Sequence, residues 1–283
     1  MSRFFIPPTA IRGKSFVLSG SEAHHALNVL RKKVGDAIDL FDGEDLSFRG
    51  RIESVVSQEI RGTIVEALPP TSLPVQLTLF QALTRGPKWE WLLEKACEVG
   101  VAKVVPVFTQ RTLIKLDAAQ AREKQKRWNR IALAASKQCG RSDLMSVDAP
   151  CMLATALERL EKSQLSLIPW EKETQRTIHE ALSILFPLPP KVGEGVGEGP
   201  ITSAVLPSSR PSPILRTGER ERQSVAVSQI NLFIGPEGGW DAREIDLAKQ
   251  AGAIHVRLGP TLLRTETAGI VAATLVLREF GVY

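Results

Sequence analysis

The sequence predicts an α/β protein that carries a small β-rich domain at its N-terminal end. The first seventy residues contain short runs of β-branched and aromatic residues, which Gly and Asp interrupt. After the proline-rich stretch "ALPPTSLP", strand-like runs alternate with helix-like runs, which is typical of a largely parallel sheet covered on both faces. A chain of 283 residues is also long for one hydrophobic core. We therefore predict one domain over 1–72 and a second over 73–283.

The N-terminal part has four strand-like stretches and one helix. The strands are expected in "KSFVLSG", "AIDLFDG", "LSFRGRIESVV" and "IRGTIVEAL". Between the first two, "SEAHHALNVLRKKVGD" has apolar residues at helical spacing, and Ser21 is the expected N-cap. These elements predict a small β-rich domain with one helix.

The second part alternates strands with helices. Strands are expected at 75–83, 101–108, 164–170, 230–235 and 253–258, and helices at 86–100, 116–140, 152–162 and 177–185. Asp241 and Glu244 form a D-x-x-E capping box for a further helix that ends at Gly252. The last helix, expected over 268–280, is apolar nearly all round, so it should be buried by its own domain and by a partner subunit.

Residues 187–224 interrupt this alternation. They are dominated by Pro, Gly and Ser and are poor in apolar residues, which predicts a disordered insertion. Their spaced glycines follow no strand and open no helix, so they do not indicate a nucleotide-binding loop.

Charge and composition narrow the function classes. The net charge is +5, and residues 73–150 hold thirteen basic against seven acidic residues. This surplus favours a polyanionic partner, although a solvated helix face explains it equally well. Three scattered cysteines and four histidines without metal-ligand spacing predict neither a disulfide framework nor a metal site. No apolar run is long enough to span a bilayer and no signal-peptide core is present, so we expect a cytoplasmic protein.

Two glycine-containing loops, "IGPEGG" (234–239) and "LGPTLLR" (258–264), follow predicted strands. In open α/β sheets ligands bind at that edge. The chain has neither a G-x-G-x-x-G after a strand nor a GxxxxGK[ST] motif, and Glu237 and Glu266 would repel a phosphate. A ligand with adenosine and a positive sulfonium, S-adenosylmethionine, suits these loops better. The alternative for Glu237 is a structural cap of the following helix.

Several motifs carry a family resemblance. "IGPEGGWDAREID" followed by "LGPTLLRTETAG" resembles the signature pair of the ribosomal RNA small-subunit methyltransferase E family, in the SPOUT class of knotted methyltransferases. "RFF", "AHHALNVLRKKVGD", "EKACEVGVAKVVPVFTQRT" and "ASKQCGR" extend the resemblance over most of the chain outside 187–224. It implies a PUA-like RNA-binding barrel, an α/β SPOUT domain with a deep trefoil knot, and a homodimer. The implied reaction transfers a methyl group from S-adenosylmethionine to N3 of one uridine in 16S ribosomal RNA.

The resemblance also implies which residues form the sites. The expected cofactor-binding residues are Pro169, Trp170, Ile234, Gly235, Pro236, Glu237, Gly238, Leu258, Gly259, Leu262, Leu263 and Arg264. The expected RNA-binding residues are Arg3, His24, Arg31, Lys88, Arg111 and Arg141, whereas His25 is expected to pack against the barrel. No metal is expected.

The catalytic residues are expected to be Arg264 and Glu266. Arg264 would stabilise negative charge on the uracil carbonyl oxygens. Glu266 would orient Arg264 or act as the base. We favour the orienting role, because a carboxylate beside an arginine is a weaker base. The alternative is that the two residues form a salt bridge that caps the last helix.

Two other functions remain open at this point. One is a SPOUT methyltransferase that acts on another RNA, such as a transfer RNA. The other is a ribosome assembly factor that kept the fold and lost catalysis, although the presence of both "GPEGG" and "LLRTETA" argues against it. A dehydrogenase or kinase is disfavoured because the phosphate-binding loops are missing.

Overall fold

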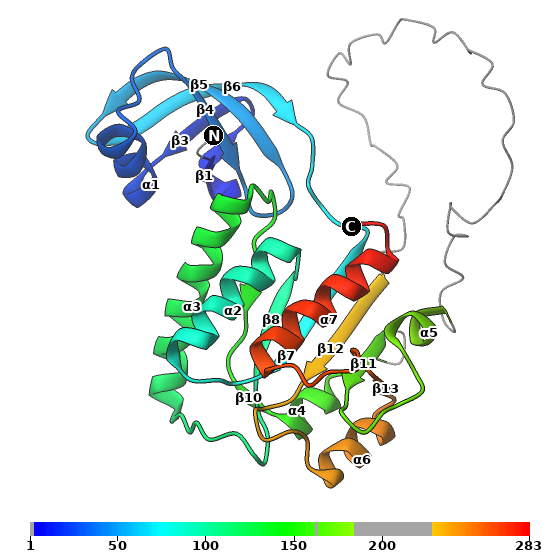
Figure 1. Ribbon diagram of the computed structural model, residues 1–283. Coiled ribbons are helices and arrows are strands. Elements are labelled where there is room, and N and C mark those ends of the chain that lie inside the picture. Colours follow the sequence, from blue (N-terminus) through cyan, green and yellow to red (C-terminus); the bar gives the residue numbers. More distant parts are fainter. Residues whose placement is uncertain (1–2, 162–163, 184–227) are drawn as a thin grey trace, which may run out of the picture.

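A computed structural model describes residues 3–161, 164–183 and 228–283, which form two sheets with their helices (Figure 1). The N-terminal sheet has six strands in the order β1-β4-β5-β6-β3-β2. Its pairs are antiparallel except for β1 and β4, which run parallel. The strands are β1 (Arg3–Phe5), β2 (Ile11–Arg12), β3 (Ser15–Leu18), β4 (Ala37–Phe41), β5 (Ser47–Val56) and β6 (Glu59–Leu68).

One helix covers this curled sheet, and it is shorter and less regular than predicted. Pro8–Ala10 form a 3-10 turn, α1 spans Gly20–His24, and a π-helical turn continues it over His25–Val29. Ala23 and Ala26 face the core of the barrel. The predicted cap at Ser21 is wrong, because Ser19 occupies the N-cap position and Ser21 lies inside the first turn.

The second sheet is entirely parallel, in the order β10-β8-β7-β12-β11-β13, with β9 paired to β8. Its strands are β7 (Val75–Ala82), β8 (Lys103–Phe108), β9 (Ser146–Val147), β10 (Cys151–Met152), β11 (Leu165–Pro169), β12 (Ser228–Ile234) and β13 (Ile254–Val256). The predicted parallel sheet is confirmed. The short strands β9 and β10 were not predicted, because two residues carry no periodic signal.

Helices cover both faces of this sheet (Figure 1). One core cluster joins the sheet to α2 (Gly86–Val99), α3 (Ala118–Cys139), α5 (Ile178–Ser183) and α7 (Thr265–Glu279). The cluster on the other face holds α4 (Leu153–Glu158) and α6 (Ala242–Gln250). α7 begins three residues before the expected start at 268, and α4 is shorter than the predicted 152–162. The predicted insertion 187–224 lies outside the described residues.

Local capping explains where the helices begin and end. The predicted box of Asp241 and Glu244 is present at the start of α6. A second box, formed by Asp117 and Gln120, opens α3. Gly100 ends α2 with a φ of 101°, a left-handed conformation that glycine adopts without a steric cost.

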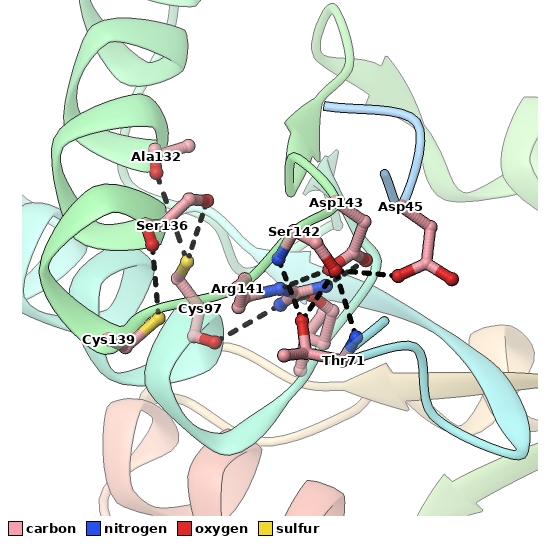
Figure 2. Close-up of polar contacts among 10 residues, drawn as sticks. Asp45, Thr71, Cys97, Ala132, Ser136, Cys139, Arg141, Ser142 and Asp143 are labelled. Atoms are coloured by element: carbon pink, nitrogen blue, oxygen red, sulfur yellow. Dashed lines mark hydrogen bonds and ion pairs between the residues drawn. The ribbon is translucent and has the colours of Figure 1, made fainter. Parts of the chain in front are cut away.

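The two sheets are tied together at the C-terminal end of α3. Lys137 donates to Glu22 on α1 at 2.7 Å. Ser142 exchanges hydrogen bonds with Thr71 of the linker and donates to Asp45 of the barrel at 2.7 Å (Figure 2). These contacts fix the barrel against the end of α3.

Two classes of feature are not found in the part of the chain that the structure describes. Over these residues no helix is both long and apolar enough to cross a membrane. In the same ranges no group of three or more His, Cys, Asp or Glu side chains is placed to hold a metal ion.

The packing of β5, β6 and β3 generates a first testable prediction. A Cβ on Gly62 would lie 2.6 Å from the Phe16 ring and closer still to the Arg51 carbonyl oxygen. The backbone oxygen cannot move without breaking the sheet, so Gly62→Ala should destabilise the protein by about 2–3 kcal/mol. Chemical denaturation measures this, with the exposed Arg61→Ala as a control that should change stability by less than about 0.5 kcal/mol. Equal stabilities would show that the sheet relaxes around the added methyl group.

Candidate functional site

A cavity of about 570 Å³ lies where the loops after β11, β12 and β13 meet. These strands are neighbours in the sheet and parallel, so their carboxyl ends open on the same edge. The twelve residues expected to bind the cofactor all line this cavity: Pro169, Trp170, Ile234, Gly235, Pro236, Glu237, Gly238, Leu258, Gly259, Leu262, Leu263 and Arg264. The structure therefore brings together three segments that are far apart in the sequence.

One wall of the cavity is apolar. Leu262 is 86% exposed and is the most exposed large hydrophobic residue among those described. Leu263 is also exposed, and Trp170 and Leu258 complete the wall. Leaving a leucine in water forfeits about 1.5–3 kcal/mol of burial, so such a wall favours a flat apolar ligand.

The polar part of the cavity lining contains both acidic and basic side chains. Glu171, Glu173 and Glu237 line the cavity together with Arg257 and Arg264. Backbone N–H groups of Gln175 and Arg176 donate to Glu173 and lower the pKa of its carboxyl group. A zwitterionic ligand would find a partner for each of its charges here.

Buried side chains hold the loops in register. Trp240 donates from Nε1 to the Pro169 carbonyl at 3.1 Å, and its indole packs directly on Gly235, where a Cβ would lie 3.0 Å from the ring. Gln81 donates to Thr265 Oγ1 at 3.0 Å, and that hydroxyl donates to the Gly235 carbonyl. Sequence reasoning missed Gln81, Thr265 and Trp240. Gln81 is one of three polar residues in β7, so the sequence carried no signal that singled it out.

Arg111, expected to bind RNA, holds the "GPEGG" loop. It donates to the Gly238 carbonyl at 2.8 Å and lies 3.4 Å from Asp241. The backbone N–H of Gln110 donates to Glu244 at 2.7 Å. The loop after β8 therefore supports the loop after β12.

Of the two residues expected to be catalytic, Arg264 is exposed at the cavity and Glu266 is buried. Arg264 occupies the N-cap position of α7, is exposed and lines the cavity. Glu266 is only 8% exposed, and its Oε1 lies 3.5 Å from Lys88 Nζ. Among the described residues no ion pair joins Arg264 to Glu266, so neither the orienting role nor the capping salt bridge is supported. Lys88, expected to bind RNA, is the ionic partner of Glu266 and also lies 3.9 Å from Glu237.

Arg141, also expected to bind RNA, has its polar contacts within the protein (Figure 2). Its side chain is 10% exposed, and it donates to the carbonyls of Cys97 and Val101 and to both oxygens of Asp143. Burial by itself would lower the pKa of Arg141, but the hydrogen bond and the charge of Asp143 raise it. With its donors engaged inside the protein, this guanidinium is not available to a phosphate.

Some of the barrel's arginine and histidine side chains make contacts within the protein, and others are exposed. Arg3 donates to the Gly140 carbonyl and to Ser47 Oγ, and its guanidinium lies 5.6 Å from the Phe41 ring. His25 packs edge-on against Phe4 with ring centroids 5.8 Å apart, as expected. His24 and Arg31 are exposed, so they stay predictions for RNA contact.

Comparison with known proteins agrees with a small N-terminal domain followed by a larger α/β domain. An RNA methyltransferase domain family matches residues 71–187 and 211–277, and an RNA methyltransferase PUA domain family matches residues 18–65. The chain is thus an RNA methyltransferase by class. It is 25% identical over 280 residues to the ribosomal RNA small subunit methyltransferase E of Bacillus subtilis, covering 98% of this chain and 96% of that protein. The Synechocystis protein of the same name is 29% identical, with 95% and 75% covered. The chain belongs to the ribosomal RNA small subunit methyltransferase E family.

Solved structures show the same fold. A methyltransferase from Legionella pneumophila with bound S-adenosylmethionine is 27% identical, with a TM-score of 0.73 over 98% of this chain and 96% of that chain. The ribosomal RNA small subunit methyltransferase E of Neisseria gonorrhoeae, bound to the same cofactor, is 25% identical, with a TM-score of 0.72 over 98% and 97%.

The buried position of Arg141 generates the second prediction. Arg141→Met leaves Asp143 and two buried carbonyls without their donor, so it should cost about 3 kcal/mol of unfolding free energy. Arg31→Met, at an exposed position, should leave stability unchanged and reduce the salt dependence of RNA binding by about one phosphate contact. Denaturant unfolding and binding titrations at several salt concentrations separate the two. A stable Arg141→Met protein with a lower salt slope would restore Arg141 to the RNA surface.

Proposed function

We propose that this protein transfers a methyl group from S-adenosylmethionine to N3 of one specific uridine in 16S ribosomal RNA. The observation that carries the proposal is the cavity, where all three predicted loops meet in a chain of this family. The relatives bear the name of a small-subunit ribosomal RNA methyltransferase, which supports the choice of RNA.

The residues present fit S-adenosylmethionine. The leucine wall suits adenine, the three carboxylates suit the ammonium and sulfonium charges, and the two arginines suit the carboxylate of the ligand. At Gly259 an added Cβ would meet no protein atom within 4 Å, so the backbone there is open for close approach by a ligand. When bound, the cofactor supplies an electrophilic methyl group on a positively charged sulfur.

Arg264 performs the electrostatic part of the reaction. Neutral uracil N3 is a poor nucleophile, and the loss of its proton to solvent places negative charge on the adjacent carbonyl oxygens. Arg264 lies at the edge of the cavity, exposed and without an ionic partner among the described residues, so its donors are free to stabilise that charge. A preorganised guanidinium does this without the reorganisation that water would need.

RNA binds along the basic surface on the barrel and α3. Exposed cations on α3 are Arg122, Lys124, Lys126, Arg127 and Arg130, and His24 and Arg31 supply the barrel side. Of the earlier candidates, Arg3, Arg111 and Arg141 are engaged within the protein. Phosphate contacts by this surface make the affinity fall steeply with salt.

The fold features of the family complete the proposal. The domains divide at 72–73, and the SPOUT domain carries a deep trefoil knot. Support comes from α7, which follows the edge strand β13 yet packs on α2 and the central strands β7 and β12. The protein works as a homodimer in the cytoplasm. Ile270, Val271 and Leu275 remain only half-buried on α7, which supports a partner subunit on that helix.

The third prediction tests the role of Arg264. Arg264→Ala should lower kcat for methyl transfer by about 100- to 1,000-fold, because the charge that develops on the uracil oxygens loses its donor. The fold should persist, since Arg264 is exposed and makes no side-chain cap of α7. Methyl incorporation into small ribosomal subunits assembled on unmodified 16S RNA, followed by mass mapping of nucleosides, measures both the rate and the methylated atom.

The matched control is Arg278→Ala, an exposed arginine in the last turn of the same helix, which should retain wild-type turnover. Wild-type turnover in Arg264→Ala would refute the assignment. Methylation by the wild type at a site other than uridine N3, or in another RNA only, would overturn the proposed function.

A further inference from the structure

Trp170, in the wall of the cavity, packs against a buried histidine of the neighbouring strand. Trp170 follows β11, and its backbone N–H donates to the Val256 carbonyl of β13 at 3.0 Å. Ile254 and Val256 pack on the face of the sheet that α2 and α7 cover, so His255 between them points to the other face. There its ring meets the Trp170 indole edge-on, with ring centroids 5.4 Å apart and an angle of 60° between the ring planes.

His255 can act on the cavity only through Trp170. It is 8% exposed and is not among the residues that line the cavity. Its Nε2 is buried, and no hydrogen-bond partner for this atom lies among the described residues. Buried polar atoms are usually hydrogen-bonded. A ring that is held by an aromatic contact instead, away from the ligand, is placed to support its neighbour and not to transfer a proton.

Charged groups of both signs surround His255. Asp246 and Lys249 lie on α6, and Glu173 and Arg176 lie in the loop after β11. Burial and then the positive charge of Lys249 lower the pKa of His255, while the two carboxylates oppose this shift. The neutral imidazole is therefore the form that this position favours.

The Trp170 ring already has two cations beside it. Lys172 Nζ and Lys249 Nζ each lie 5.9 Å from the centroid of the Trp170 ring. A protonated His255 would bring a third positive charge to the same ring, and it would do so in a buried position. Burial and repulsion between like charges both disfavour that form. The contact between the two rings thus suits a neutral His255.

We infer that neutral His255 is a positioning residue, which holds Trp170 against the cofactor, so that cofactor binding weakens in acid. This inference rests on the proposed function, which places S-adenosylmethionine in the cavity. It adds a residue that lies outside both glycine-containing loops, 234–239 and 258–264. A bound cofactor covers Trp170 and removes water from the rings, so the ligand and the neutral form of His255 favour each other.

The direction of the pH effect follows from the lowered pKa of His255. The neutral form is fully present above the ordinary histidine value of about 6.5. The affinity that depends on it is lost as the pH falls below this value, by at most about tenfold per pH unit. The stability that the buried neutral ring gives to the fold is lost in the same direction.

Calorimetric titration with S-adenosylhomocysteine between about pH 8 and pH 5 tests the inference, because this ligand needs no RNA and is not turned over. The wild-type affinity should be constant above about pH 7 and fall about five- to tenfold by about pH 5. His255→Phe keeps a ring against Trp170 but takes up no proton. Its affinity should match the wild type within about twofold at pH 8 and fall less than about twofold at pH 5.

Further variants separate the ring contact from the titration. His255→Ala removes the ring on which Trp170 packs, so it should weaken binding about fivefold or more even at about pH 8. His179→Gln is the matched control, since it removes an exposed histidine on α5 and should keep the wild-type pH profile. Thermal unfolding shows whether each variant is folded. If His255→Phe is not, His255→Gln takes its place in the pH comparison.

The inference is overturned if the variant without the titrating ring keeps the wild-type pH profile, or if the wild-type affinity does not change with pH. A folded His255→Ala that binds as tightly as the wild type would also overturn it. Methyl transfer to uridine N3 by the wild type is measured separately on small ribosomal subunits. A failure of the proposed RNA reaction is therefore seen apart from a failure of His255 to position Trp170.

Discussion

The site depends on one buried hydrogen-bonded chain that runs from Gln81 through Thr265 to Gly235. It joins the end of β7, the first turn of α7 and the loop after β12, which are separated by up to 184 residues. The fit is close, because a Cβ on Gly269 would lie 2.5 Å from Gln81 Oε1. With α7 held here, the segment that leaves β13 must cross the carboxyl ends of the strands, and that crossing forms the cavity.

The basic surplus of the middle segment serves two purposes that a count of charges does not separate. Lys137 pairs with Glu22 and so fastens the barrel to the C-terminal end of α3. Arg141 donates to the carbonyls of Cys97 and Val101 and so ties the segment after α3 to the end of α2 (Figure 2). Arg111 supports the cofactor loop. The exposed cations of α3, together with Arg85 and Lys115, remain for a polyanion. The junction therefore places the RNA-binding barrel at a fixed position relative to the site, which a flexible linker would not do.

Residues close together in the sequence predicted the helices and strands. Contacts between residues distant in the sequence determine which side chains face a ligand and which hold the fold together. Capping boxes, prolines and glycines fixed the ends of α3, α6 and α2, because these depend on neighbouring residues. The burial of Arg141 depends on carbonyls about 40 residues away, and the pairing of Lys88 with Glu266 joins α2 to α7. Neither is visible in the sequence, where both residues are cations in a basic segment. The cavity residues could be predicted because the family resemblance indicates all three loops.

The charges around the cavity have to suit two ligands of opposite charge, the sulfonium of S-adenosylmethionine and the RNA backbone. A sulfonium favours carboxylates, whereas those carboxylates repel an RNA backbone. The structure keeps Glu171, Glu173 and Glu237 on the lining and offsets them there with Arg257 and Arg264. Glu266 is buried, and Lys88 lies beside it, so its charge is paired as well. Lys88 links the two groups of carboxylates, because it contacts both Glu237 of the lining and the buried Glu266.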